Sequence, residues 1–551
     1  MKRNSKIIAL IMGLVMCLAL LAACGDPPAP VAPVDTGPIT AHEDVEVADD
    51  EGAIVMEAID VEEIEEGYVL ADYIHVIIDN NNIAVLDPHM PAAGATSTNW
   101  ILTMIHDRLI QDIPGMDGFQ PGLATRWHTD DYRIFEFELR QGVTFHNGEP
   151  FTADDVIWTI NRVQAEGLGS SAFDQWRPVV SATAPDPYTL ILELDDIDVD
   201  FLFGIARPPA GILNRVAIEA DPELGPHVGT GAYSVERFVT LSYALLNANP
   251  DWWGGAPVTE QIRFRFVPEM PTRTIMMQNG DAHISFGTPA DDMDYFIASP
   301  DFEVFSTTSN DPQGLAFNLN DPITGDYYFR RAVAHAIYRP AIAMGAAGQW
   351  ADGDLQDGAF WGFMTEFRNE NIEVPVRDLD LARYYLEKSS YNGEEVEIAA
   401  AIITFIRMAQ VIQMQLEEIG INAVVNQMEA PALAAHARYG GNHQIVCFFT
   451  LINPSAGSAR HAFIEGGAQN RASFNDPRVT ELLDEARRTI DVNERAAMYM
   501  EVQEIVAETL AYQNILWRVF GNVRVNSLGG FIGHPDPAAH DFRNLYMLVE
   551  G

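Results

Sequence analysis

The 551-residue chain has few cysteines and few basic residues, and both shortages limit what it can be. It contains three cysteines, Cys17, Cys24 and Cys447, and no CxxC pair, so neither a disulfide framework nor a paired-cysteine zinc site is expected. Lysine and arginine total 33 against 79 aspartates and glutamates, which gives a net charge of −46. Because nucleic acids and anionic lipids are bound through cationic side chains, we expect no nucleic-acid partner.

Common catalytic motifs are also missing. The sequence has no HExxH, GxSxG, GxGxxG or EF-hand pattern, and the glycine-rich run at Gly229-Thr230-Gly231 has neither the lysine nor the spacing of a P-loop. Its histidines are scattered along the chain, which leaves open a cluster formed in space. We therefore predict no catalytic residues, no metal ligands and no cofactor, and a protein that is not an enzyme.

The N-terminal residues form a targeting pattern. Basic residues at positions 2, 3 and 6 precede an apolar run over 7–21, and Leu21-Ala22-Ala23-Cys24 follows. This end resembles a bacterial lipobox, which implies a signal peptide over 1–23 and a lipid on Cys24. The alternatives are an ordinary secretory cleavage site or an uncleaved anchor. Residues 24–68 are rich in acid and proline and have no lysine or arginine, as expected for an extended spacer.

The stretch 121–163 carries the clearest structural pattern. From Tyr132 to Arg140 apolar and polar residues alternate, which predicts a half-buried strand. Thr152 occupies an N-cap position, and Asp154 and Asp155 fall in the first turn of the helix expected after it. We interpret the two aspartates as capping residues rather than as a catalytic acid pair. A second amphipathic helix is expected over 402–420, closed by glycine, with a strand after it.

Several separate motifs resemble those of the family 5 extracellular solute-binding proteins of ABC importers, and they follow the same order along the chain. They are the stretch 121–163, Leu86-Asp87-Pro88, Gly229 to Tyr233, Asn249 to Gly255 and the C-terminal run 528–546. The resemblance implies an α/β, periplasmic-binding-protein-like clamp of type II, with two main lobes, a hinge and a third lobe. Lobe I would comprise 69–93, 196–308 and 525–551, lobe II 94–195, and lobe III 309–524.

The same resemblance implies a function. It suggests a receptor, lipid-anchored on the outer (extracellular or periplasmic) side of the cell membrane, that captures a peptide or peptide-like solute between lobes and delivers it to ABC permease and ATPase subunits. Two alternatives stay open: a surface sensor or chaperone that uses the same clamp, or a receptor for a sugar or a metal chelate. The run Ile445 to Pro454 contains no acid, whereas peptide-binding relatives commonly have an aspartate there that pairs with the ligand's amino terminus.

The resemblance also suggests ligand-binding positions, some of which have a structural alternative. Thr98 and Asn99 could instead cap a helix, and Trp517 could instead be a core residue. The suggested ligand-binding residues are Thr96, Ser97, Thr98, Asn99, Asn318, Phe448, Phe449, Asn453 and Trp517.

Overall fold

A computed structural model of the chain describes residues 68–78, 83–90, 96–112, 118–166, 171–288, 290–348, 351–352, 367–449, 459–533 and 539–550. All of them belong to one compact unit, Val47–Gly551. Their strands form four sheets, and the largest has eleven strands. Among the described residues, no helix is both long enough and apolar enough to cross a membrane.

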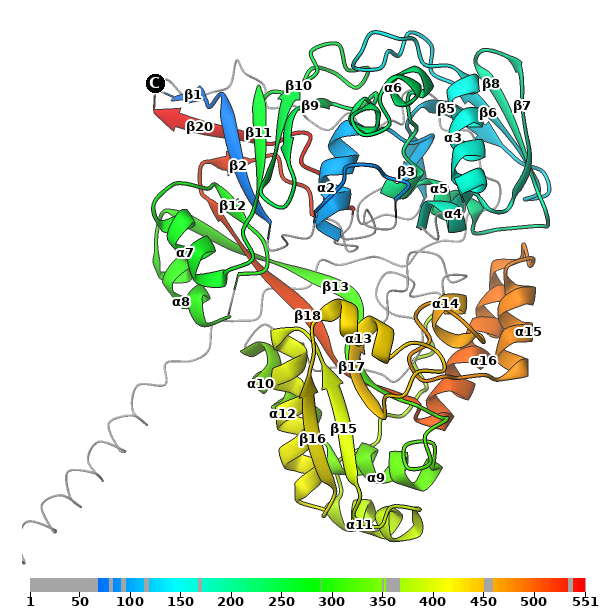
Figure 1. The fold of residues 1–551 in the computed structure, drawn as a ribbon, viewed down its shortest axis with the longest axis vertical. Helices are drawn as coiled ribbons and strands as arrows, with labels where there is room; N and C mark the ends of the chain where they lie inside the picture. Colours follow the sequence, from blue (N-terminus) through cyan, green and yellow to red (C-terminus); the bar gives the residue numbers. More distant parts are fainter. Residues whose placement is uncertain are drawn as a thin grey trace, which may run out of the picture. The chain divides into compact units, whose positions relative to one another are not determined.

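The large sheet joins segments that are far apart in the sequence. Its strand order is β16-β15-β17-β13-β18-β12-β2-β11-β10-β9, and β14 pairs with β18 off this path. Figure 1 shows β13 and β18 as two long strands between the remaining strands of the sheet. The bounds are β2 Tyr73–Ile78, β9 Tyr233–Val239, β10 Tyr243–Ala248, β11 Gln261–Phe266, β12 Ile284–Ser285, β13 Phe302–Phe317, β14 Ala351–Asp352, β15 Glu395–Ala400, β16 Asn422–Gln427, β17 Ile445–Phe449 and β18 Tyr512–Val525.

A separate four-stranded antiparallel sheet has the order β5-β6-β8-β7. In β6, Phe135, Phe137 and Leu139 are buried while the residues between them are exposed, so the predicted half-buried strand is confirmed. The remaining strands form two small sheets. The bounds are β1 Tyr68–Leu70, β3 Ile110–Asp112, β4 Phe119–Pro121, β5 Ala124–His128, β6 Ile134–Leu139, β7 Val179–Asp186, β8 Thr189–Leu194, β19 Leu528–Gly529 and β20 Tyr546–Glu550.

Two helix boundaries follow signals that the sequence carries. Helix α3 starts after Thr152, whose backbone N–H donates to the Asp155 carboxylate at 2.9 Å, so the predicted capping role of Asp155 is confirmed. Helix α12 is followed by Gly420 at φ +92° and then by β16, as predicted. The α-helices are α2 Thr96–Ile105, α3 Ala153–Glu166, α4 Ser171–Trp176, α5 Phe201–Ile205, α6 Arg215–Ala220, α7 Met270–Gln278, α8 Ala290–Ala298, α9 Tyr327–Ala336, α10 Arg339–Ala347, α11 Leu379–Lys388, α12 Ile403–Glu417, α13 Ala430–His436, α14 Arg460–Phe463, α15 Pro477–Ala486 and α16 Val492–Thr509.

Within the part of the chain that the structure describes, buried apolar residues form three large clusters. The first core lies within residues 315–517, the second within 109–212, and the third combines residues from 74–105, 232–286 and 528–547. A smaller cluster packs helices α7 and α8 against Ile77 of β2 and Val523 of β18. The second core extends to Ile212, beyond the expected end of lobe II at residue 195. The lobe boundaries given above stay a prediction.

Candidate functional site

The two long strands β13 and β18 connect the halves of the large sheet. Near one end of the antiparallel pair, Glu303 and Val304 oppose Arg524 and Val523, which also pair with β12. Near the other end, Leu315 opposes Gln513 and also pairs with Cys447 of β17. Each strand therefore belongs to both halves of the sheet, and the backbone passes between them twice.

The ladder between β13 and β18 is interrupted in the middle. Its register shifts between Thr308 and Pro312 and again between Gln313 and Gly314. A bulge leaves residues unpaired and allows a strand pair to bend and twist locally. Proline cannot donate a ladder hydrogen bond, so Pro312 weakens pairing at this point. The interruption is thus a structurally suitable hinge.

An aromatic cluster lies beside the first half of this crossing. The ring of Phe286, which follows β12, lies 6.4 Å from Phe305 of β13 and 4.7 Å from Trp100 of α2. Phe531 and His540 pack against the same ring, at 5.2 Å and 5.7 Å. These contacts connect helix α2 to β13 just before the strand crosses.

The first turn of α2 contains four of the predicted ligand residues. Thr96 is exposed, whereas Ser97, Thr98 and Asn99 are buried. Thr98 Oγ1 and Asn99 Oδ1 have no hydrogen-bond partner within the described part of the chain. A buried polar atom without a partner costs free energy, so a solute or water that satisfies these oxygens would stabilise the protein.

On the other side of the crossing, two predicted aromatic residues lie in the first core. Phe448 packs on Tyr512 at a ring distance of 5.4 Å, and Trp517 is 8% exposed. The core alternative considered for Trp517 therefore agrees with its burial. Phe449 pairs through its backbone with Gln313. Trp517 pairs through its backbone with Pro312. Phe449 and Trp517 therefore both lie opposite the interruption in β13.

Gln313 was not among the residues singled out from the sequence. Its side chain is 2% exposed, and Oε1 has no hydrogen-bond partner among the described residues. It stands between Pro312 and Gly314 in a strand that holds several other polar residues, so nothing local in the sequence singles it out.

The side chain of Asn318 forms hydrogen bonds with the backbone of the protein. Its Nδ2 donates to the backbone carbonyls of Gly441 at 3.0 Å and His443 at 2.8 Å, and its Oδ1 accepts from Asn320 N–H at 3.1 Å. Both amide hydrogens are therefore used inside the protein, and a bound solute could reach Asn318 only through a remaining oxygen lone pair. Its predicted ligand role stays a prediction.

Two predicted sites fall outside the described residues: Asn453 and the lipidation site Cys24. Cys447 is a buried free cysteine, and burial raises the pKa of its thiol strongly, which makes it unreactive. Within the ranges described, no group of three or more His, Cys, Asp or Glu residues could hold a metal ion.

Two half-sheets joined by a pair of interrupted strands, with unpartnered polar groups nearby, define the class of hinged solute-binding proteins. The sequence profile of the bacterial extracellular solute-binding proteins, family 5 Middle, matches residues 118–460, and the chain belongs to this family. The predicted family and the type II binding-protein fold are confirmed. Members of the family are extracytoplasmic, non-enzymatic binding components of ABC importers, which also confirms that the protein is not an enzyme.

Individual relatives support the same class. The chain is 24% identical over 427 residues to the glutathione-binding protein GsiB of Escherichia coli strain 536, covering 74% of this chain and 82% of GsiB. The ABC transporter substrate-binding protein CtaP of Listeria monocytogenes has a TM-score of 0.77 at 18% identity and covers 87% of this chain and 100% of CtaP. DppA of Helicobacter pylori in complex with the peptide STSA has a TM-score of 0.76 at 20% identity, covering 87% of this chain and 98% of DppA.

Proposed function

We propose that this protein captures a peptide or peptide-like solute between its hinged halves and delivers it to the permease and ATPase of an ABC importer. The observation that carries the proposal is the interrupted β13–β18 crossing in a member of family 5. The glutathione and peptide ligands named for GsiB and DppA support the solute class. Bending at the crossing would bring both halves onto the solute and exclude water from it.

Binding can be tested by thermal unfolding with glutathione and with the peptide Ser-Thr-Ser-Ala. A ligand that binds only the folded state stabilises it by about 2.7 kcal/mol at a concentration of 100 Kd. The expected result is a concentration-dependent rise in Tm with no chemical change in the peptide. Cleavage of the peptide, or no stabilisation by any member of a peptide library, would contradict the proposal.

The first turn of α2 gives a matched pair of variants. In Thr98→Val the buried hydroxyl without a described partner is lost, so affinity for the stabilising peptide should fall roughly tenfold while the solute-free protein keeps its stability. Thr103→Val lies on the same helix and removes an acceptor used by Arg108. It should leave peptide affinity unchanged. If both variants bind the peptide with the same affinity as the unaltered protein, Thr98 does not contact the solute.

A receptor for a solute without a free amino group is the second candidate. It is favoured by the lack of any acid in the run 445–454, where relatives that hold a peptide amine commonly have one. N-acetylated Ser-Thr-Ser-Ala should then stabilise the protein at least as much as the free peptide. A strong preference for the free amine would instead show that another carboxylate holds it. Sugars and nickel–histidine chelates in the same assay test the non-peptide solutes.

The membrane anchor is a further part of the proposal. Acyl chains on Cys24 would hold the protein at the membrane, since each buried methylene contributes about 0.8 kcal/mol. The unaltered protein and Cys17→Ala should carry acyl chains, and Cys24→Ala should carry none, as measured by mass spectrometry. An unaltered protein without acyl chains would contradict lipid anchoring.

A further inference from the structure

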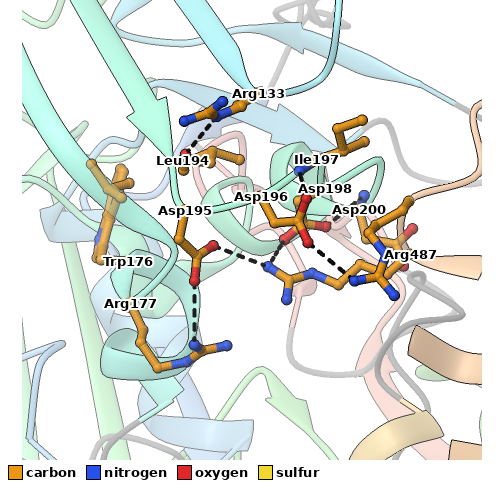
Figure 2. A network of polar contacts seen from close by, with 12 residues as sticks. Arg133, Trp176, Arg177, Leu194, Asp195, Asp196, Ile197, Asp198, Asp200 and Arg487 are labelled. Carbon is orange, nitrogen blue, oxygen red and sulfur yellow. Dashed lines mark hydrogen bonds and ion pairs between the residues drawn. The ribbon is translucent and has the colours of Figure 1, made fainter. Parts of the chain in front are cut away.

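A second connection between parts of the molecule lies away from the β13–β18 crossing. The segment 195–200 leaves β8 at the edge of the second core and contains four aspartates. Opposite it, Arg487 and Arg488 follow α15, which packs on the first core. Figure 2 shows the side chain of Arg487 between Asp195 and Asp198.

The contacts between the two sides are mostly ionic. Arg487 Nη2 donates to Asp198 Oδ2 at 2.8 Å and lies 3.9 Å from Asp195 Oδ1. Arg488 Nη1 donates to Asp196 Oδ2 at 3.1 Å. The backbone N–H of Val199 donates to the carbonyl of Arg487 at 3.1 Å. Opposite charges therefore face each other across this contact.

Each side is held in place by contacts within its own part of the molecule. The backbone N–H of Asp195 donates to Pro178 O, that of Asp198 donates to Tyr132 O, and that of Asp200 donates to Asp198 Oδ1. On the other side, α15 is capped by Asp476 and buries one face in the first core. A salt bridge between preorganised groups loses less conformational entropy than one between free side chains.

The connection differs from the hinge because it has no shared strand. Within the described residues, no β-ladder joins the sheet β5-β6-β8-β7 to the large sheet. The contact between segment 195–200 and the end of α15 can therefore separate without breaking a sheet. The backbone crossing at β13 and β18 cannot.

We propose that Arg487 and the segment 195–198 form an ionic latch that holds the first and second cores together in the closed state and opens when solute is released. Arg487 and Asp198 form its centre, with side chains 21% and 9% exposed, and Arg488 and Asp196 form its rim, at 50% and 49%. The central pair stabilises closure more because it is less screened by water. The latch rests on the proposed solute capture, since it sets how long the clamp stays shut.

The test measures closure directly in the full chain without added solute. Spin labels are attached at Val180→Cys on β7 and Met414→Cys on α12, positions 61% and 58% exposed, in a Cys17→Ala, Cys24→Ala background. Double electron–electron resonance gives the ratio of long to short distances. Arg487→Gln should raise the open-to-closed ratio roughly tenfold, and Arg488→Gln should raise it less than about twofold.

A second variant keeps the test independent of folding defects in the first. Asp198→Asn removes the charge but keeps Oδ1 as acceptor for Asp200 N–H. It should open the protein as much as Arg487→Gln, and the double variant should open it no further. Distance distributions equal to those of the unaltered protein in both single variants, or an equal effect of Arg488→Gln, would overturn the latch. The rise in Tm with peptide is a separate measurement from the label distances. If the distances contradict the latch, the Tm can still show solute binding, and if the Tm shows no binding, the distances can still show the latch.

Discussion

Two arginine–aspartate pairs connect different cores of this protein, and they differ in burial and in number of contacts. Arg162 of α3 donates to both carboxylate oxygens of Asp87, at 3.2 Å and 2.7 Å, and the two side chains are 10% and 9% exposed. Arg487 makes one short hydrogen bond to Asp198, and its side chain is about twice as exposed as that of Arg162. The first pair joins the second core to the segment after β2, and the second pair joins the second core to the first.

The difference separates a permanent joint from a reversible one. The Arg162–Asp87 pair also includes His89, whose Nδ1 accepts from Arg162 at 2.9 Å while Nε2 donates to the carbonyl of Gly211 at 3.2 Å. Removing one member of such a buried network leaves the others without partners. Water can replace the contacts of the more exposed Arg487 at lower cost, so that pair is suited to opening and closing.

The largest expected effect comes from breaking the buried pair. Arg162→Gln leaves the Asp87 carboxylate buried without its cation and should lower the free energy of unfolding by about 3–5 kcal/mol, measured by urea denaturation. Arg133→Gln is the matched control, since Arg133 pairs with Glu193 while both side chains are nearly half exposed. It should cost less than about 1 kcal/mol. Equal losses in the two variants would mean that burial does not distinguish the pairs.

A smaller effect should appear on acidification. Burial, opposed by the charge of Asp87 and reinforced by that of Arg162, lowers the pKa of His89 to about 4. The unfolded imidazole binds a proton near pH 6.5, so His89 contributes stability above that pH. This contribution is lost by about 1.4 kcal/mol for each pH unit as the pH falls from about 6.5 toward 4.

The variant His89→Gln separates this contribution from that of other titrating groups. A glutamine amide can accept from Arg162 and donate to Gly211 but does not titrate in this range. The difference in unfolding free energy between the unaltered protein and His89→Gln should therefore depend on pH between about 4 and 6.5. A constant difference across this range would show that His89 is not held neutral by its surroundings.

The smallest expected effect is that of salt on closure. Raising the ionic strength from about 0.1 M to 1 M shortens the screening length from about 10 Å to 3 Å. The open-to-closed ratio of the labelled protein should rise roughly two- to threefold, and the rise should be smaller in Arg487→Gln. The stability lost in Arg162→Gln should not change with salt. An identical salt response in the unaltered protein and in Arg487→Gln would show that the ion pair of Arg487 does not hold the closed state.

Much of the local structure could be predicted from the sequence because its causes are local. The alternation of Phe135, Phe137 and Leu139 against polar neighbours predicted β6, and the Thr152–Asp155 pattern predicted the start of α3. Gly420 marked the end of α12 for the same kind of reason. The family motifs gave the fold class, which matching of residues 118–460 to the family profile confirms.

The site was less accessible to sequence reasoning because its contacts are long-range. Asn318 stays a predicted ligand residue, and the use of its amide to bind carbonyls more than a hundred residues away, at Gly441 and His443, could not be predicted. Gln313 was overlooked, because only the register of β13 against β17 and β18 places it at the interrupted crossing. The pairing of Asp198 with Arg487 could not be predicted either, since no periodicity connects residues 289 positions apart.

In the proposed function, the two halves of the protein close on a solute by bending at the β13–β18 crossing. The most direct test is the distance between labels at Val180→Cys and Met414→Cys, measured with and without a peptide library at a concentration that raises Tm. The library should shift the population from long to short distances. Distances that stay unchanged while the Tm rises would show that the protein binds its solute without closing, and would contradict the account.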